Sequence, residues 1–402
     1  MLGGLPRTFW VLWVGMFINR AGAFVVPFLA IYLTQGRGVS AAAAGAVVAC
    51  YGAGAAVASP LGGYLADHLG RRATMIGSLF MGGSGVMALG FVHDLAVLAP
   101  ACFLAGLVSE AYRPAMQAAV ADLVPAHDRV RAFGILYWVI NLGYSFGLLL
   151  AGLLASRSFL LLFIGDGLTS MAFAVLVWRL VPETRPPHAE SGAAARPGLV
   201  RGFLVPYRDA PFAVFIGLSL LVLLLFMQHV AALPITMSEA GLSRRLLGLV
   251  LGLNGIVIVL VQPFLAPIVT RWNRSRTLAL GSALVGLGFG VNAVAREPLL
   301  MAIGVVVWTV GEICVLPIGN AVVADVSPSA LRGRYQGAYG LCFGLAAFGA
   351  PLIGTFVLQR FGPPTLWLGC LAAGALAALG HLVLEPRLSR LREVRLAERG
   401  GH

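Results

Sequence analysis

The sequence predicts an all-α integral membrane protein with twelve transmembrane helices in two pseudo-symmetric six-helix bundles. Three observations lead to this fold class. The 402 residues are 59% hydrophobic and only 11% charged, whereas about a quarter of the residues of a soluble domain are charged. Apolar runs of about 20 residues, the length of a helix that spans a bilayer, recur along the whole chain. Related residues also recur at a constant offset of 203 positions.

The apolar runs are separated by charged residues or by Pro and Gly. They predict spans near residues 8–34, 41–66, 73–92, 96–124, 131–155, 159–181, 211–237, 245–270, 277–295, 298–325, 333–358 and 364–384. Between the sixth and seventh runs, a stretch rich in Pro, Ala, Gly and charge predicts a flexible linker. We therefore expect a six-helix bundle over 1–181, a cytoplasmic linker over 182–210, a second six-helix bundle over 211–384 and a cytoplasmic tail over 385–402.

The constant offset links residues in several pairs of spans. The matched pairs are Pro60 and Pro263, Pro114 and Pro317, Asp122 and Asp325, Pro125 and Pro328, Arg131 and Arg334, and Gly134 and Gly337. One offset that serves several spans predicts two bundles of the same topology. Such repeats are related by an axis along the membrane normal, with the substrate path between them.

The basic residues, all arginines, predict the orientation of the chain. With a cytoplasmic N-terminus, 20 of the 28 arginines fall in cytoplasmic segments and six in outer segments. This asymmetry predicts that both termini and the linker are cytoplasmic, and it accounts for the net charge of +12 without a nucleic-acid partner. We expect a multi-pass monomer in the lipid bilayer of the cytoplasmic (inner) membrane of a bacterium.

The residue pattern does not indicate an enzyme. There is no Walker loop, and no nucleophile stands at a useful spacing from a base. The five cysteines lie within apolar runs and have no metal-ligand spacing, so they read as small buried hydrophobic residues. We therefore expect no cofactor and no metal.

A charged stretch bounded by glycines, GGYLADHLGRR, follows the second span. Gly63 permits two helices to approach closely, Gly70 permits a turn, and Asp67 suits a helix N-terminus or an arginine. The alternative is a plain topogenic loop, in which Arg71 and Arg72 only anchor the cytoplasmic face. The spacing of the residues favours a specific helix contact and turn over a plain topogenic loop.

This stretch is similar to the signature G-x-L-x-D-x-x-G-R-[RK] of the major facilitator superfamily, matched at Gly63, Leu65, Asp67, Gly70, Arg71 and Arg72. With twelve spans, a middle linker and two similar halves, the resemblance covers essentially the whole chain and implies the major facilitator fold. It implies that the loop gates alternating access, and that Asp67 meets the start of the eleventh helix near Arg332 and Arg334. The second copy, shifted by 203 residues, lacks the Asp and the second Gly, so only the first copy is expected to be strong.

Ionisable residues in the middle of spans are costly and are candidates for substrate or proton binding. Arg20, Glu110, Arg113 and Glu312 are such residues, and Arg20, Glu110 and Glu312 lie about 18–20 Å from the cytoplasmic ends of their spans, at 1.5 Å per residue. Glu110 and Arg113 share a helix face, and Arg20 can join them in a compensated cluster, either functional or a fixed brace. Glu312 has no basic residue within a turn of its own helix, which favours it as the proton or cation site. Its alternative is pairing with Arg113 or Arg20, and Asp166 is a second protonation candidate.

Five further residues are candidates to line the cavity: Trp308, Asn141, Gln117, Tyr137 and Asn320. Trp308 lies four residues before Glu312 on the same helix face. Its ring is a candidate seat for a lipophilic cation, with simple packing as the alternative. The asparagines can equally bond one helix to another.

The tenth span carries a second resemblance. TVGEICVLP at residues 309–317 is similar to the tenth-helix segment of the drug:proton antiporter branch, the LmrP and MdtH type. NRAGAFVVPFLAIYL in the first span and RGRYQGAYG (332–340) at the start of the eleventh are similar to the same branch. The resemblance implies that Glu312 takes part in proton coupling and in the binding of cationic drugs.

The sequence therefore predicts a secondary active transporter that works by alternating access on small molecules and protons. Proton-coupled efflux of lipophilic or cationic molecules, of the multidrug type, is the favoured function. The alternatives are an importer or facilitator of a small organic anion or metabolite, held by Arg20 and Arg113, and a lipid translocator. An anion importer would depend on Arg20 and tolerate loss of Glu312, and an exporter would show the reverse.

Overall fold

The computed structural model describes residues 4–25, 28–29, 32–155, 157–185, 199–269 and 271–400. Every regular element of these residues is a helix, which confirms the all-α class. The chain forms two compact units. The first comprises Met1–Ala132, Val139–Val205 and Ser327–Gly344, and the second comprises Phe133–Trp138, Pro206–Val326 and Leu345–His402. The division into bundles at the linker stays a prediction, and residues 186–198 of that linker lie outside the described part.

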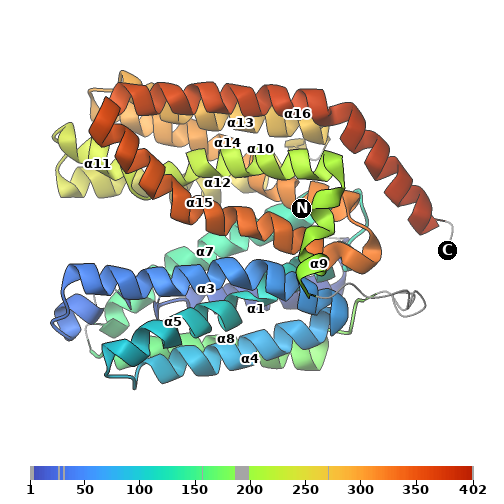
Figure 1. Ribbon diagram of the computed structural model, residues 1–402, viewed down its shortest axis with the longest axis horizontal. Coiled ribbons are helices and arrows are strands. Elements are labelled where there is room, and N and C mark those ends of the chain that lie inside the picture. The colour runs from blue at the N-terminus through green and yellow to red at the C-terminus, as the bar shows by residue number, and fades with distance from the viewer. Residues whose placement is uncertain are drawn as a thin grey trace. The chain divides into compact units, whose positions relative to one another are not determined.

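The first unit is built mainly from the N-terminal helices. They are α1 (Arg7–Ala21), η1 (Tyr32–Gly36), α3 (Ala41–His68), α4 (Arg71–Leu89), α5 (Leu95–Glu110), α6 (Tyr112–Leu123), most of α7 (Arg129–Ala155), α8 (Leu160–Leu180) and α9 (Leu199–Leu204). Helix α3 packs on α5, α4 packs on α5 and α8, and α1 packs on α8. Figure 1 shows α3, α5 and α4 side by side. The unit also takes in η6 (Ser329–Leu331) and the start of α15 (Arg332–Phe361).

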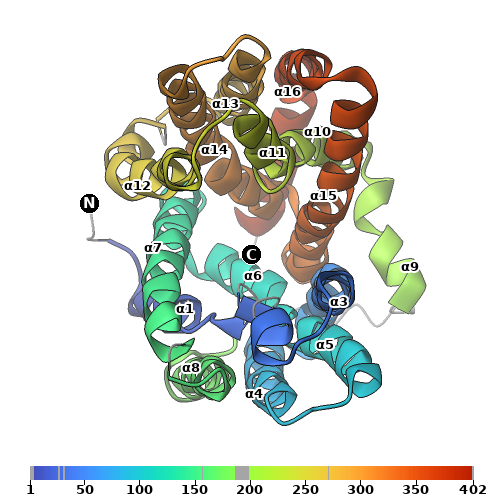
Figure 2. The ribbon, with the colours of Figure 1, turned by 90° about the vertical axis from the view of Figure 1, so that its left-hand side faces the viewer.

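The second unit is built mainly from the C-terminal helices. They are η3 (Pro206–Arg208), α10 (Ala210–Phe226), η4 (Met227–His229), α11 (Ala232–Glu239), α12 (Arg244–Val269), α13 (Arg274–Gly290), η5 (Val291–Ala293), α14 (Pro298–Val326), the end of α15 and α16 (Pro363–Gly400). Helix α13 packs against both α14 and α16, α12 packs on α14, and α10 packs on α16. Figure 2 views this unit from one end, with α15 running obliquely.

Eight helical stretches among the described residues are long and apolar enough to cross a membrane. They are Ala43–His68, Leu95–Leu123, Leu160–Leu180, Ala210–Glu239, Leu246–Leu265, Pro298–Val326, Ser329–Phe361 and Pro363–Arg395. The four other expected spans coincide with α1, α4, α7 and α13, of which α1 and α13 have only 15 and 17 helical residues. The chain is thus a multi-pass membrane protein.

The first expected span is interrupted. Helix α1 ends at Ala21, and residues 23–24 are not helical, while residues 26–27 and 30–31 lie outside the described part. The Asp166 carboxylate of α8 accepts a hydrogen bond from the backbone N–H of Val25 (3.1 Å), a donor that the interruption leaves without a helical acceptor. Arg20 stands in the last turn of α1, next to this interruption, and its place in the middle of the span stays a prediction.

Other spans are broken or longer than expected. The fourth span divides into α5 and α6 at Ala111, where Pro114 cannot supply the backbone N–H that would bond to residue 110. The seventh span divides into α10 and α11 around the 3₁₀ turn Met227–His229. In contrast, α16 continues through Pro386 to Gly400, so the expected tail is helical up to that residue. Residues 401–402 lie outside the described part.

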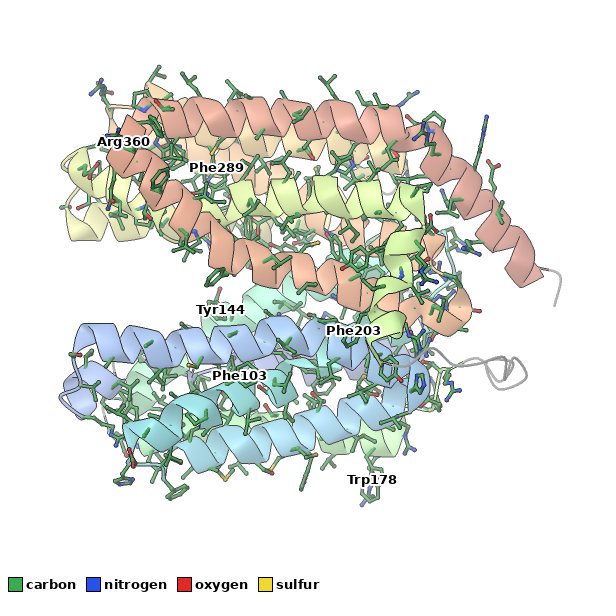
Figure 3. The ribbon with its side chains drawn as sticks, in the orientation of Figure 1. Phe103, Tyr144, Trp178, Phe203, Phe289 and Arg360 are labelled. Atoms are coloured by element: carbon green, nitrogen blue, oxygen red, sulfur yellow. The ribbon has the colours of Figure 1, made fainter. Side chains whose placement is uncertain are left out.

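Stacked aromatic rings fill the core of the second unit. Phe289 of α13 stacks on Trp308 of α14, with ring centroids 5.3 Å apart, and on Trp367 of α16, at 6.1 Å. The two tryptophans are 1% and 0% exposed. Figure 3 shows Phe289 among the helices of this unit. Beside the rings, α13 and α16 cross at glycines: a Cβ at Gly374 would lie 2.5 Å from the Cα of Gly286.

We expect Gly374→Ala to destabilise the protein by about 1–3 kcal/mol, because the added carbon would overlap the backbone of α13 and the two helices must move apart. The measurement is the midpoint of thermal unfolding of the full chain in detergent. The matched control is Gly369→Ala on the same helix, where an added Cβ meets nothing within 4 Å. Equal midpoints for the two variants would contradict the tight crossing.

Candidate functional site

The carboxylate of Asp67 caps the N-terminus of α15. It accepts hydrogen bonds from the backbone N–H groups of Gly333 and Arg334, both at 2.9 Å. These donors lie in the first helical turn and have no acceptor within their own helix, and the helix dipole favours a negative charge there. Asp67 is 7% exposed. The contact that the superfamily signature implies is therefore present, and its role in gating stays a prediction.

Both glycines of the signature have a steric reason. A Cβ at Gly63 would overlap the carbonyl oxygen of Gly333, so α3 meets the start of α15 only because this position has no side chain. Gly70 has φ +102° and precedes the first turn of α4, a conformation that favours glycine. That turn is capped by Glu183, whose carboxylate accepts from the backbone N–H groups of Arg71 (2.9 Å) and Arg72 (3.1 Å). The spacing of the motif gave no sign of Glu183.

Arg71 is 1% exposed and connects four segments of the first unit. Its guanidinium lies 3.2 Å from Asp67 and 3.1 Å from Asp122, and it donates to the carbonyl oxygens of Ala66 and Ser329, each at 3.0 Å. Arg332 forms an ion pair with the same Asp122. Such a buried network is more than a topogenic anchor.

Arg72 differs from its neighbour. It is only partly buried, and its guanidinium donates to the backbone carbonyl oxygen of Trp178 at the end of α8. Trp178 is 52% exposed, and its ring projects away from the unit in Figure 3. Arg72 therefore links the start of α4 to the end of α8 and is not part of the network of Asp67, Arg71 and Asp122.

The second unit retains part of this arrangement. Asp325 of α14, the offset partner of Asp122, is 1% exposed and forms ion pairs with Arg274 and with Arg392 of α16. The expectation that the second copy is weak overlooked this pair. A shift of 203 residues maps Arg71 onto Arg274, so the signal was present in the sequence.

The first unit holds a polar cluster around Arg20. The guanidinium donates to the hydroxyl of Tyr112 (2.7 Å) and to the side-chain oxygen of Asn19 (2.9 Å), and Asn19 in turn donates to Ser170 (3.0 Å). These partners are neutral. Within the described residues Arg20 forms no direct ion pair, but it attracts Glu110 through space, so the three-residue cluster with Glu110 and Arg113 stays a prediction.

Glu110 and Arg113 do pair with each other. They form the expected ion pair across the break between α5 and α6, and the Arg113 side chain is 47% exposed. Asp166 binds the interrupted backbone of the first span, as described above. Gln117 is partly buried on α6, and Asn320 donates to the carbonyl oxygen of Leu316 in its own helix (3.0 Å). Asn141, partly buried on α7, accepts from the Ser145 hydroxyl through its backbone carbonyl (2.9 Å).

Glu312 is 3% exposed on α14 and has neutral partners on both carboxylate oxygens. Oε1 accepts a hydrogen bond from the Tyr137 hydroxyl, and Oε2 accepts one from the side-chain amide nitrogen of Asn254 (2.8 Å). In the part of the chain that the structure describes, no basic side chain forms an ion pair with Glu312. The sequence pointed to Glu312 and Tyr137 separately, and the fold brings them together.

A short segment of α7 supplies Tyr137. Residues Phe133–Trp138 belong to the second unit, unlike the rest of this helix. The indole N–H of Trp138 donates to the carbonyl oxygen of Val259 (3.1 Å), and the amide of Gln262 donates to that of Gly134 (2.5 Å). Two hydrogen bonds to α12 thus fix the segment from which Tyr137 reaches Glu312.

Trp308 does not form the expected seat for a cation. Phe289 covers one part of its ring, and His229 and Phe226 lie at centroid distances of 5.7 and 5.8 Å. A ring that is 1% exposed offers no free face, so Trp308 serves packing. The spacing of four residues from Glu312 was read correctly, but rings from other helices occupy the space.

Comparison with known proteins identifies the family. The model of the Major Facilitator Superfamily matches residues 12–235 and 215–400. The chain belongs to this superfamily. Its members are transporters, so the chain is a transporter of small molecules and not an enzyme.

Individual members of the superfamily are similar over most of the chain. An uncharacterized MFS-type transporter, YqjV of Bacillus subtilis (strain 168), is 28% identical and covers 88% of this chain and 87% of its own. A Na(+), Li(+), K(+)/H(+) antiporter of Planococcus maritimus is 22% identical, with 88% of each chain covered. The crystal structure of the human organic anion transporter MFSD10 (TETRAN) has a TM-score of 0.78 at 17% identity, and the match covers 94% of this chain and 100% of that one. It shows the fold alone.

We expect Asp67→Asn in the superfamily signature to lower the free energy of unfolding by about 1–3 kcal/mol, because it removes one of the two buried carboxylates that pair with Arg71 and weakens both hydrogen bonds to α15. The measurement is again the thermal unfolding midpoint. Asp94→Asn is the control: Asp94 caps α5 through the N–H of Ala96 at an exposed position, and Asn caps a helix as well as Asp. Similar midpoints for both variants would show that the charge at position 67 is not needed for stability.

Proposed function

We propose that this transporter couples the inward flow of protons to the export of lipophilic or cationic small molecules. It would act by alternating access as a monomer in the inner membrane of a bacterium, with both termini cytoplasmic. The observation that carries the proposal is Glu312, a carboxylic acid in an apolar span whose two oxygens contact neutral donors. An ionisable group at such a place is retained for function by default, because its burial is costly.

The chemistry of Glu312 suits exchange. As a carboxylate it attracts a cation, and as a neutral acid it does not. Tyr137 and Asn254 stabilise the charged form by hydrogen bonding and do not neutralise it, so the charge remains available to a substrate. Because one carboxylate cannot hold a proton and a cationic substrate at once, binding of either releases the other.

The contact of Asp67 with α15 would supply the gate. A carboxylate bound to the first turn of a helix stabilises one arrangement of α3 and α15, and movement of either helix breaks two charge-assisted hydrogen bonds. The similarity to the Planococcus maritimus antiporter supports cation-for-proton exchange. The resemblance of the tenth span to the drug:proton antiporter branch supports a lipophilic substrate.

We expect inside-out vesicles that contain the protein to accumulate ethidium, a lipophilic cationic dye, when the vesicle interior is made acidic. Glu312→Gln should abolish this uptake, because the amide cannot exchange a proton. Glu239→Gln, which neutralises an exposed acid at the end of α11, should leave uptake unchanged. Gradient-driven uptake that persists in the Glu312→Gln variant would refute the proposal.

A specific observation favours one other function, transport of an organic anion. Arg20 is partly buried, and its hydrogen-bond partners Asn19 and Tyr112 are neutral, so Glu110 and Asp166 attract its charge only through space and its guanidinium has no ion pair in the described residues. Under this alternative, Arg20→Gln should abolish uptake of fluorescein, an aromatic organic anion, while Glu312→Gln retains it. The exposed Arg157→Gln is the control for loss of charge alone. Under the proposed export function, the requirement is reversed, and ethidium transport depends on Glu312.

A further inference from the structure

The hydrogen bonds next to Glu312 determine which end of the Asn254 amide faces it. The hydroxyl of Thr309 donates its single hydrogen to the carbonyl oxygen of Val305 (2.6 Å). Toward any other neighbour, the Thr309 oxygen can therefore only accept. One end of the Asn254 amide lies 3.1 Å from this oxygen and 2.8 Å from Oε2 of Glu312. Both neighbours are acceptors, so the NH₂ group must point toward them.

This orientation does not depend on the charge of Glu312. When Glu312 carries a proton, the Thr309 oxygen still requires a donor from Asn254, because the Thr309 hydroxyl hydrogen remains hydrogen-bonded to the carbonyl oxygen of Val305. Thr309 is 0% exposed and lies one helical turn before Glu312 on the same face. Water therefore does not compete for its oxygen. The side chain of Thr309 thus acts on Glu312 through Asn254, without touching the carboxylate.

We propose that Thr309 and Asn254 are positioning residues that make Glu312 a site for protons and not for alkali cations. The proposal rests on the proposed function and specifies the coupling ion of the same site. Hard cations are bound through the lone pairs of several oxygen ligands. Around Glu312, Asn254 presents N–H and Tyr137 presents O–H, so the neighbours of the carboxylate supply hydrogens where a metal ion would need oxygens.

The other groups around Glu312 leave this assignment unchanged. Tyr137 comes from α7, Asn254 from α12 and Thr309 from α14 itself. The titratable group on the next element is His229 of η4, which stacks on Trp308 one turn from Glu312 and bonds the backbone carbonyl of Phe226. Among the described residues, the side chains in contact with Glu312 or with Asn254, namely Tyr137, Asn254 and Thr309, carry no charge that would pair with the carboxylate.

The test is the pH profile of proton-driven ethidium transport by the full-length protein in proteoliposomes. Thr309→Val keeps the shape of the side chain but removes the acceptor that orients Asn254. Without this restraint the amide of Asn254 can turn its oxygen toward the protonated acid, which stabilises the protonated form, so the half-maximal pH should rise by roughly one unit. Thr309→Ser retains the hydroxyl and should restore the wild-type profile. Asn254→Leu should give the same shift, and the double variant should add little to either single change.

Alkali cations provide the second measurement. Replacing choline chloride by an excess of NaCl or LiCl should leave wild-type transport unchanged within twofold. Competition by either salt would overturn the assignment of Glu312 as a proton site. An unchanged pH profile in both Thr309→Val and Asn254→Leu would overturn the positioning role. If Thr309→Val does not fold, Asn254→Leu decides the same question.

The proposed function can fail separately from this inference. If transport persists in Glu312→Gln, the proposed function is wrong. If Glu312→Gln abolishes transport but the pH profile of the Thr309 and Asn254 variants matches that of the wild type, only the positioning role is wrong. A merely structural role of Thr309 would lower the amount or rate of active protein without moving the pH profile, and Thr309→Ser separates these effects.

Discussion

In an apolar helical interior without water, every polar group must find its partner within the protein, and this constraint shapes the buried acidic sites described above. The buried Asp67, the partly buried Asp166 and the exposed Glu183 all bind backbone N–H groups at helix starts or at an interruption. Such a carboxylate cannot leave without exposing a backbone donor. Glu312 is held by side chains instead. Side chains rotate more freely than backbone, so Glu312 can change its partners at a lower cost than the other three acids.

Hydropathy predicted where the spans lie but not how they are interrupted. A run of apolar residues sums to the same mean whether or not the helix is continuous, so the end of α1 at Ala21 was missed. Pro114 was visible, and its missing N–H explains the division of the fourth span. The partner that stabilises the interruption of the first span, Asp166, is more than 140 residues away, and no local pattern reports such a contact.

The candidate site shows the same limit. Glu312 stands out in the sequence because a charge in an apolar span is rare, and the glycines and acid of the motif stand out by spacing. The roles of Asn254 and Thr309 depend on contacts between α12 and α14, 55 and 58 residues apart in the chain. The two alternatives for Trp308 could not be separated for the same reason, since Phe289 reaches it from another helix. Spacing on one helix defines a face, whereas neighbouring helices decide what that face meets.

The last turns of α16 make the surroundings of Asp325 differ from those of Asp122, its counterpart in the first half of the sequence. Asp122 forms ion pairs with Arg71 and Arg332, whereas Asp325 forms ion pairs with Arg274 and Arg392. Arg392 lies on the part of α16 that extends beyond the last apolar run. Arg395 of the same extension faces Asp209 at the start of α10 (3.9 Å). If the halves arose by duplication, the copies diverged in where each acid obtains its second cation. Selection can therefore act on the length of α16, because a shorter helix that lacks Arg392 and Arg395 removes a counter-charge from Asp325 at the end of α14 and from Asp209 at the start of α10.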